Sequence, residues 1–253
     1  MSGEKEYHIQ LARGDVGRYV LLPGDPGRVP KIAACFDRAE EVASNREYRT
    51  FTGTVDGIRI SATSTGIGCP SAAICIEELI RCGADTFIRV GTAGGLQPGI
   101  EVGDLAITTA TVREEGTTRQ YVPLEYPAVA DLEVTTALRD AAARLGYRHH
   151  VGIGHTKDAF FTEAATDLPL LEHCREQWKV WERAGVISTS MEAAALFVIS
   201  SIKRVRCGEV LAILGLTYKD EPIVAKAGID EAIKVAIEAV KLLAERDKEK
   251  TAG

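Results

Sequence analysis

Residues 87–95 read Phe87-Ile88-Arg89-Val90-Gly91-Thr92-Ala93-Gly94-Gly95, an apolar run that passes through an arginine and a hydroxyl into a series of glycines. The pattern predicts a buried strand that ends near Val90 in a glycine turn. Ligands bind α/β sheets at strand ends, and glycine lets backbone N–H groups approach an anion closely. An arginine adds a fork that matches phosphate oxygens. We therefore expect Arg89 and the segment Val90-Gly91-Thr92 to form an oxyanion site.

A second stretch upstream carries the same chemistry. Tyr19–Leu22 is apolar and is followed by Pro23-Gly24-Asp25-Pro26-Gly27-Arg28. Two glycine turns, each with an arginine at the end of an apolar strand, indicate one shared oxyanion site for Arg28 and Arg89. Arg46 is a third candidate for this clamp. For Arg46, an exposed ion pair of low energy is an equally good explanation.

Elsewhere the chain alternates apolar strand patterns with amphipathic helix patterns. The expected strands are Tyr19–Leu22, Thr86–Val90, Leu105–Val112, Val151–Ile153 and Val210–Leu214, with a hairpin in Glu47–Thr65 around Asp56-Gly57. The expected helices are Arg28–Phe36, Ala72–Cys82, Leu132–Leu145, Leu170–Ala184, Glu192–Lys203 and Ile229–Leu243. This alternation predicts an α/β fold with three α/β/α layers around a central mixed, mostly parallel β-sheet. No linker or repeat interrupts the pattern, so residues 1–253 are expected to form a single domain.

The composition of the chain excludes several functional classes. The 253 residues are 45% hydrophobic and carry a formal net charge of -6, which favours neither nucleic acid nor a membrane surface as partner. No apolar stretch approaches the roughly 20 residues of a membrane helix, and residues 1–10 lack a signal-like apolar core. The six cysteines form no CxxC pair. We expect reduced core cysteines in a cytoplasmic protein.

Two further stretches suggest chemistry. Glu192 opens an alanine-rich helical segment, where it can complement the helix dipole or accept hydrogen bonds from the vicinal diol of a ribose. Phe160 and Phe161 are paired aromatics in a polar context. We expect Phe161 to lie in the core, and one of the two rings to face a cleft where it can stack on a heterocycle. His8 lies in a polar N-terminal arm and, taken alone, is an incidental histidine.

Several catalytic classes lack their motifs in this sequence. There is no HExxH, CxxC, GxSxG or Walker lysine, so a metal-dependent or serine hydrolase is not expected. The glycines of 91–95 also miss the GxGxxG spacing of a dinucleotide-binding fold.

Taken together and in order, these motifs resemble the hexameric nucleoside phosphorylases of the uridine phosphorylase and purine nucleoside phosphorylase superfamily. The resemblance runs from about His8 to Leu243. It is carried by Pro23-Gly24-Asp25-Pro26-Gly27-Arg28, Asn45-Arg46-Glu47-Tyr48, Ser64-Thr65-Gly66-Ile67-Gly68, Arg89-Val90-Gly91-Thr92-Ala93-Gly94 and Met191-Glu192-Ala193-Ala194.

The resemblance implies a role for each matching residue. Phosphate would be held by Gly24, Arg28, Arg89, Val90, Gly91 and Thr92, joined by Arg46 of a neighbouring subunit. Ribose would be bound by Thr92, Met191 and Glu192, with His8 of the neighbour at the 5′-hydroxyl. The base would lie against Ala93, Gly94 and Phe160. The catalytic residues would be Arg28, Arg89 and Glu192, and Glu47, Ile67 and Ser71 match a potassium site between subunits.

The same resemblance implies the reaction and its partners. Phosphate would be the co-substrate, and no organic cofactor would be needed. The expected products are a free base and ribose 1-phosphate, and the expected assembly is a hexamer built as a trimer of dimers. A nucleosidase is a less favoured alternative, because three converging arginines suit phosphate and not water. A non-catalytic nucleoside-binding protein is the other, and Ser190 and the missing base-reading residues keep it open.

Two departures from the family pattern concern the base, and a third lies in the segment matched to ribose binding. Phe160 is followed by Phe161-Thr162-Glu163-Ala164-Ala165-Thr166, without the glutamine and arginine that usually read uracil. The late strand has Leu214 and Gly215 where purine phosphorylases place a protonating aspartate, and Ser190 replaces the first glutamate of Glu-Met-Glu.

We expect a preference for uridine, because uracil can leave as an anion with its charge spread over two carbonyl oxygens. Thr162 and Lys219 are then candidate contacts to the base. A purine nucleoside phosphorylase on the same fold is the alternative, with Asp220 as a displaced acid.

Overall fold

One strand of the sheet changes its pairing partner midway along one edge, and a cavity lies at that point. In the computed structural model, which describes residues 4–163, 167–217 and 227–252, ten strands form one mixed sheet. The strands are β1 (Tyr19–Leu22), β2 (Arg38–Asn45), β3 (Tyr48–Val55), β4 (Ile58–Thr63), β5 (Thr86–Gly95), β6 (Leu105–Glu114), β7 (Ala128–Val129), β8 (His149–Lys157), β9 (Ser188–Ser190) and β10 (Arg206–Leu216).

β5 is the strand at which the sheet divides. β10 pairs in parallel along the whole of β5. The other edge of β5 is shared, because β1 pairs in parallel with Thr86–Arg89 and β9 pairs antiparallel with Gly94 and Gly95. β6 and β8 complete a partly closed ring of β5, β10, β6, β8 and β9, and β4, β3 and β2 extend the sheet beyond β1. Within the described residues no strand pairs with 90–93 on the β1 side, so the sheet opens there.

The glycines of β5 are needed for close packing and do not form a turn. The strand continues through the glycine series, so the predicted turn after Val90 is wrong. Gly91 and Gly94 have no positive φ. A Cβ on Gly91 would lie 2.5 Å from Leu211 Cδ2, and one on Gly94 would lie 2.4 Å from Thr217 Oγ1. These glycines are therefore required because neighbouring side chains fill the space that a Cβ would occupy.

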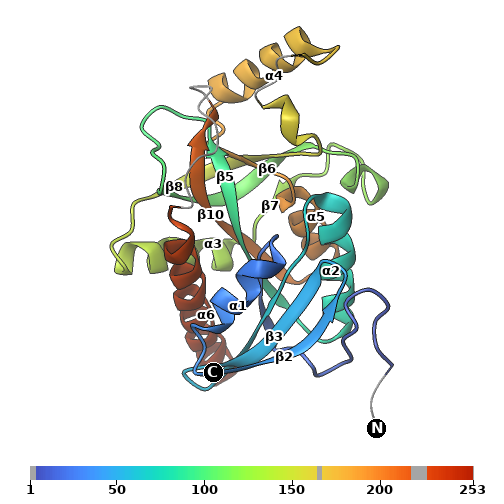
Figure 1. The fold of residues 1–253 in the computed structure, drawn as a ribbon. Helices are drawn as coiled ribbons and strands as arrows, with labels where there is room; N and C mark the ends of the chain where they lie inside the picture. The colour runs from blue at the N-terminus through green and yellow to red at the C-terminus, as the bar shows by residue number, and fades with distance from the viewer. Residues whose placement is uncertain (1–3, 164–166, 218–226, 253) are drawn as a thin grey trace.

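Helices cover both faces of the sheet, which confirms the predicted three layers (Figure 1). The helices are α1 (Val29–Ala33), α2 (Cys69–Arg81), α3 (Leu132–Arg144), α4 (Leu171–Arg183), α5 (Ala193–Lys203) and α6 (Ile229–Ala252). One apolar core lies between the sheet and α1, α3 and α6, and a second lies between the sheet and α2 and α5. The molecule is thus a mixed α/β domain.

The alternation of side chains along β5 decides which core each residue meets. Ile88 and Val90 belong to the core beneath α3 and α6, and Phe87 belongs to the core beneath α2 and α5. Arg89 consequently lies on the face of Phe87, toward the start of α5. The Arg89 guanidinium is therefore placed next to the opening of the sheet, on a strand whose neighbouring residues are apolar.

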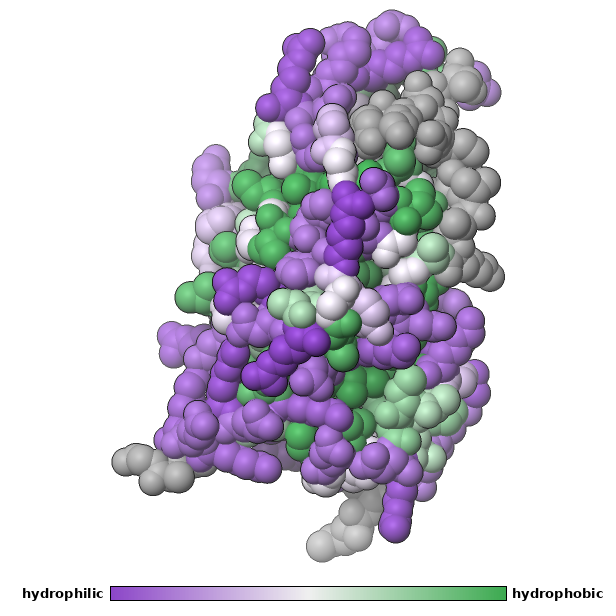
Figure 2. Space-filling model, turned by 90° about the vertical axis from the view of Figure 1, so that its left-hand side faces the viewer, coloured by the Kyte–Doolittle hydropathy of each residue, from purple (hydrophilic) through white to green (hydrophobic). Residues whose placement is uncertain are grey.

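α4 differs from the other helices because it packs against no core. None of its residues is buried, and Figure 1 shows it projecting from the end of the molecule. In Figure 2 the same tip is covered mainly by hydrophilic residues, while hydrophobic side chains form smaller groups lower on that face. The helix is tied to the preceding loop by Trp178 Nε1, which donates to the Thr162 carbonyl at 2.8 Å.

The prediction that the cysteines are core residues holds for four of the six and is wrong for Cys35, which is exposed, and for Cys174, which is partly exposed. All six are free, and Cys69, Cys75, Cys82 and Cys207 are buried. Burial raises the pKa of each of these four thiols. Separately, among the described helices none combines the length and apolarity needed to cross a membrane.

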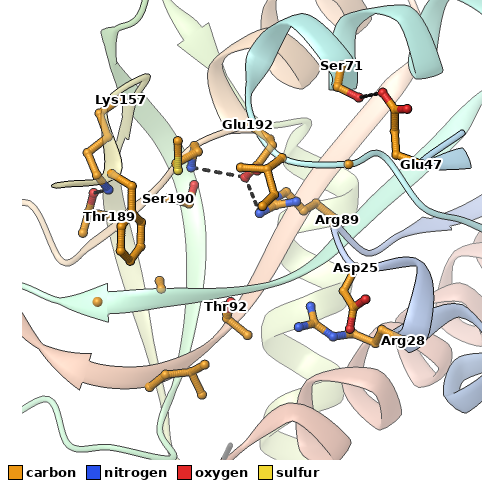
Figure 3. A pocket seen from close by; sticks show the side chains of 18 of the residues that line it. Asp25, Arg28, Glu47, Ser71, Arg89, Thr92, Lys157, Thr189, Ser190 and Glu192 are labelled. Atoms are coloured by element: carbon orange, nitrogen blue, oxygen red, sulfur yellow. Dashed lines mark hydrogen bonds and ion pairs between the residues drawn. The ribbon is translucent and has the colours of Figure 1, made fainter. Parts of the chain in front are cut away.

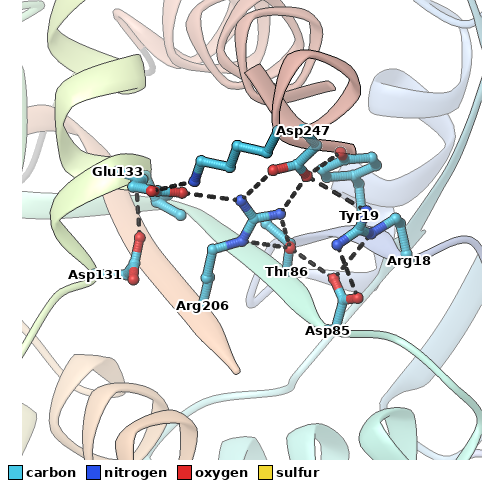
Figure 4. A network of polar contacts seen from close by, with 10 residues as sticks. Arg18, Tyr19, Asp85, Thr86, Asp131, Glu133, Arg206 and Asp247 are labelled. Carbon is cyan, nitrogen blue, oxygen red and sulfur yellow. Dashed lines mark hydrogen bonds and ion pairs between the residues drawn. The ribbon is translucent and has the colours of Figure 1, made fainter. Parts of the chain in front are cut away.

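A polar network ties α6 to the start of the central strands (Figure 4). Arg206 donates to both oxygens of Asp247, from Nη1 to Oδ1 at 2.8 Å and from Nη2 to Oδ2 at 2.6 Å. The Tyr19 hydroxyl donates to Asp247 Oδ2 at 2.7 Å. The hydrogen bonds from Arg206, followed by that from Tyr19, hold the pKa of Asp247 at about 2.

We expect Asp247→Asn to lower the free energy of unfolding by about 1–2 kcal/mol near neutral pH, after allowance for solvent screening. The native pKa of about 2 lies below the ordinary 3.8, so this stabilisation is present above pH 3.8 and is lost as the pH falls toward 2. Urea unfolding measured across this pH range should show the free energies of unfolding of Asp247→Asn and wild type becoming equal as the pH falls toward 2. Glu172→Gln, in an exposed pair with Arg175, is the matched control. Equal stability of Asp247→Asn and wild type at pH 7 would contradict this account.

Candidate active site

A cavity of about 660 Å³ lies where the edge of β5 opens (Figure 3). The loop after β1, the middle of β5, the end of β8, β9 and the start of α5 all contribute to its lining. The predicted site residues that line it are Gly24, Arg28, Arg89, Thr92, Ala93, Gly94, Phe160, Met191 and Glu192. The topology therefore brings together segments that are far apart in the sequence.

Arg89 is held between two buried carboxylates. Its Nε donates to Glu209 Oε2 at 3.0 Å, and its Nη2 forms an ion pair with Glu192. The third nitrogen, Nη1, is buried and has no hydrogen-bond partner among the described residues. A Cβ on Gly24 would lie 3.8 Å from this nitrogen, so it faces the glycine loop after β1. Because a buried donor without an acceptor is costly, the geometry favours an anionic ligand beside Gly24.

Arg28 brings a second guanidinium to the same end of the cavity. It ends the short 3-10 helix Pro26–Arg28, and its Nη1 donates to the Val90 carbonyl at 3.0 Å. Burial lowers the pKa of Arg28, and the charge of Arg89 lowers it further. Two cations that repel one another in a desolvated place are both stabilised when an anion binds between them. Val90 and Gly91 themselves do not line the cavity.

Glu192 precedes α5 as its N-cap but does not cap it. Its side chain makes no hydrogen bond to the first turn of the helix. Its carboxylate instead accepts from the backbone N–H groups of Gly68 at 2.8 Å and Met191 at 3.2 Å, and pairs with Arg89. The helix dipole alone therefore does not explain its orientation, which places a buried carboxylate on the cavity wall.

Glu209 is a buried carboxylate that the sequence analysis missed. It lies in β10, and its Oε1 accepts from Thr108 Oγ1 at 2.7 Å. Burial raises its pKa, while the charge of Arg89 and the Thr108 hydrogen bond act in the opposite direction. The signal in the sequence was a charged residue directly before the apolar run Val210–Leu214. Glu209 therefore holds Arg89 through Nε, while Glu192 engages Nη2.

Phe160 and Phe161 are both exposed to solvent, and only Phe160 lines the cavity. Phe160 lines the cavity and is 45% exposed, so it is the ring that faces a cleft. Phe161 is 80% exposed, so the prediction that it lies in the core is wrong. Both rings stand on the short turn Phe160–Thr162 before α4, where the chain leaves the core of the molecule.

Lys157, Glu163 and Thr189 form a polar cluster on the cavity wall that the sequence analysis did not single out. The Lys157 side chain is 4% exposed. Its Nζ donates to Thr189 Oγ1 at 2.9 Å and forms an ion pair with Glu163. The same nitrogen lies 5.9 Å from the centre of the Phe160 ring. A lysine at the end of an apolar strand was the signal in the sequence.

His8 and Arg46 are not in this cavity. His8 Nδ1 lies 2.6 Å from Glu78 Oε1, and Asn45 Nδ2 donates to the His8 carbonyl at 2.7 Å. Arg46 follows Asn45 at the exposed β2–β3 turn with a φ of 55°. The two residues are thus neighbours on the surface of the same chain.

Some of the positions that concern base recognition, where this sequence departs from the family, lie within the described residues. Leu214 and Ser190 line the cavity, and Thr162 does not. Asp220 and Lys219 lie outside the residues that the structure describes. Glu163 and Lys157 also line the cavity, beside Phe160.

Glu47, Ile67 and Ser71 also line the cavity. Ser71 Oγ donates to Glu47 Oε1 at 2.8 Å, and Ile67 is 76% exposed. Adjacent carboxylate and hydroxyl oxygens suit a cation that prefers oxygen ligands. The described residues contain no cluster of three or more His, Cys, Asp or Glu that could hold a metal, so a cation here would depend on neutral oxygens in addition to the Glu47 carboxylate.

Comparison with known proteins gives consistent matches. The model of the phosphorylase superfamily matches residues 18–246. A uridine phosphorylase of Thermococcus kodakarensis is 52% identical over 248 residues, covering 97% of this chain and 89% of the relative. A uridine phosphorylase of Treponema pallidum is 45% identical over 250 residues, covering 97% of each. A guanosine phosphorylase of Halorubrum lacusprofundi is 39% identical over 249 residues, covering 94% of this chain and 99% of the relative.

Proposed function

The chain belongs to the phosphorylase superfamily, and on that premise we propose that it is a uridine phosphorylase, a pentosyltransferase that cleaves uridine with phosphate. The products are uracil and ribose 1-phosphate. The observation that carries the proposal is the buried Arg89 Nη1, which has no acceptor among the described residues and faces the Gly24 loop. A nucleosidase, which uses water, has no use for such a donor.

Phosphate binds between Arg28 and Arg89. Gly24 supplies backbone that an anion can approach closely, and the Thr92 hydroxyl supplies a further donor from β5. Both guanidiniums stay charged, and Nη1 of Arg89 is the nitrogen that faces the anion. The anion beneath the sugar stabilises the positive charge that develops on the ribose ring as the glycosidic bond stretches.

Ribose is fixed by Glu192 and Met191. A carboxylate has about four acceptor positions. Three of those on Glu192 receive the N–H donors of Gly68, Met191 and Arg89. One position remains for a ribose hydroxyl, and a second is released when Arg89 turns toward phosphate. Glu192 thereby holds C1′ facing the phosphate, which is a positioning effect.

The base lies against Ala93, Gly94 and Phe160, and uracil is preferred to a purine. Leu214 offers only apolar contact where a purine would gain from an acid at N7, whereas uracil carries its charge on two carbonyl oxygens. We expect kcat/KM at saturating phosphate to be at least about tenfold higher for uridine than for inosine. A higher value for inosine would overturn the preference.

A purine phosphorylase is the second candidate, because the relative from Halorubrum lacusprofundi is named a guanosine phosphorylase. In that case Asp220 would be the acid. Asp220→Asn should then lower the rate for inosine selectively. If the rate for uridine is the higher one and Asp220→Asn leaves it unchanged, the purine assignment is excluded.

We propose that the site is completed by a second subunit of a hexamer built as a trimer of dimers. His8 and Arg46 lie together on the surface and outside their own chain's cavity. This arrangement suits residues that serve a neighbouring cavity, with His8 at the ribose 5′-hydroxyl and Arg46 at the phosphate.

Mixing Arg46→Ala with Arg89→Lys, which keeps a cation between Glu192 and Glu209, tests the shared site. Each variant alone should be nearly inactive, and a mixed dimer contains one cavity with both arginines intact. Activity should therefore return after subunit exchange, which is checked by native mass spectrometry. Exchange without any recovered activity would mean that each site is built from one chain.

Three further features complete the proposal. Glu47 and Ser71, with the Ile67 segment, would hold a potassium ion between two subunits, where it would supply charge neutralisation and rigidity. The whole of residues 1–253 would act as one catalytic domain. The free, mostly buried cysteines fit a cytoplasmic location, since disulfides form in oxidising compartments.

A further inference from the structure

A lysine and a glutamate face the same cavity at the end away from the phosphate arginines. In Figure 3, Lys157 and Thr189 lie on one side of Glu192, and Arg28 and Asp25 lie on the other. Lys157 and Glu163 both line the cavity, and their side chains are only 4% and 12% exposed. Since phosphate occupies the arginine end, the lysine end is where a base must lie.

The Lys157 ammonium is held in place from two sides. One N–H donates to Thr189 Oγ1 at 2.9 Å, and the ion pair with Glu163 engages another. Thr189 Oγ1 also lies 3.1 Å from His155 Nδ1, and His155 Nε2 lies 2.7 Å from Glu114 Oε2. With Nε2 donating to Glu114, Nδ1 accepts the Thr189 proton, so the threonine oxygen is left to accept from lysine.

Two hydrogen-bonding partners of the ammonium are assigned among the described residues, which leaves the third N–H available to a ligand. The Trp178 ring also lies 5.6 Å from this nitrogen. The Phe160 ring lies 5.9 Å from the same nitrogen. A base that stacks on Phe160 would therefore present its edge to Lys157 and Glu163. The pair offers one donor and one carboxylate acceptor.

From this juxtaposition we infer that Lys157 and Glu163 read the base, in place of the missing glutamine and arginine. Lys157 donates to a ring carbonyl oxygen of uracil, and Glu163 accepts from N3–H. The same carbonyl and N–H edge occurs in 6-oxopurines. A 4-aminopyrimidine or a 6-aminopurine presents the opposite pattern at this edge, so it offers no acceptor to the third N–H of Lys157 and no donor to Glu163. The inference rests on the proposed function.

The two residues contribute at different stages of the reaction. As a phosphate oxygen bonds to C1′, the electron pair of the C1′–N1 bond passes into the ring and spreads over O2 and O4. The carbonyl oxygens become better acceptors, so the Lys157 bond strengthens in the transition state and lowers the barrier. N3–H becomes a poorer donor, so Glu163 acts mainly in binding. Lys157 keeps its protons throughout.

Lys157→Met tests the role of the ammonium. We expect kcat for uridine to fall about 100-fold, as for the loss of one oxyanion donor. With 5-fluorouridine, whose base leaves more readily, the loss should be about tenfold or less. Lys157→Arg, which keeps a cation, should recover most of the activity. Lys179→Met removes an exposed lysine paired with Glu176 and should behave as wild type.

Glu163→Gln tests the acceptor. The amide can donate to the unprotonated N3 of cytosine, so the preference for uridine over cytidine in kcat/KM should narrow by about tenfold, with KM for uridine raised more than kcat is lowered. An unchanged preference would overturn the role of Glu163. Equal losses for uridine and 5-fluorouridine in Lys157→Met, or no loss, would overturn the role of Lys157. If the wild type itself releases no uracil in phosphate, it is the proposed function that fails.

Discussion

Arg89→Lys is expected to lower kcat/KM for uridine phosphorolysis at least about 100-fold, with a raised KM for phosphate. Lysine keeps the charge between Glu192 and Glu209 but loses the planar fork. The nitrogen lost is the buried Nη1 that faces Gly24 and has no acceptor among the described residues. Steady-state kinetics with phosphate as the varied substrate measure the effect.

The lysine variant separates catalysis from folding. Arg89→Ala should abolish activity, but it leaves two buried carboxylates without their cation, and such a loss costs about 3–5 kcal/mol of stability. Arg89→Lys should instead retain a melting temperature close to that of wild type. Arg144→Lys, which alters an exposed arginine, is the control. Activity of Arg89→Lys within a few-fold of wild type would remove Arg89 from the phosphate site.

Glu192→Gln is expected to have an effect of similar size, a loss of about 100-fold in kcat/KM for uridine, because one charged hydrogen bond to ribose is worth about 1.5–3 kcal/mol. The amide keeps the shape of the side chain but is a poorer acceptor for a hydroxyl. With 2′-deoxyuridine, which has one hydroxyl fewer, the loss should be smaller. A loss that is equal for the two sugars would argue that Glu192 acts on the protein alone and does not touch the diol.

The strands and helices could be predicted from the sequence wherever a buried face gives the apolar residues a regular spacing. β1 was predicted with its observed bounds, Tyr19–Leu22, because all four residues are buried. β2 (Arg38–Asn45) was missed because none of its residues is buried and its sequence does not alternate. β9 (Ser188–Ser190) was missed because three polar residues carry no strand signal. The glycines of β5 were assigned to a turn because only the packing of Leu211 and Thr217 reveals why they are needed.

The candidate site shows the same division. Arg28, Arg89 and Glu192 could be selected because neighbouring glycines and a helix start mark them in the sequence. Glu209 and Lys157 also interrupt or end apolar runs, but this signal does not place them at the site, because each lies on a strand whose position depends on the closure of β5, β10, β6, β8 and β9 into a ring. Their roles arise from contacts with Arg89 and Glu163, which only the folded chain brings within reach.

The central claim is that phosphate, and not water, attacks uridine in this cavity. Its most direct test is to incubate the purified protein with uridine, with and without inorganic phosphate, while following uracil by chromatography and phosphorus by NMR. The account predicts one equivalent of ribose 1-phosphate for each uracil released, and no uracil when phosphate is left out. Release of uracil with free ribose in the absence of phosphate would contradict it.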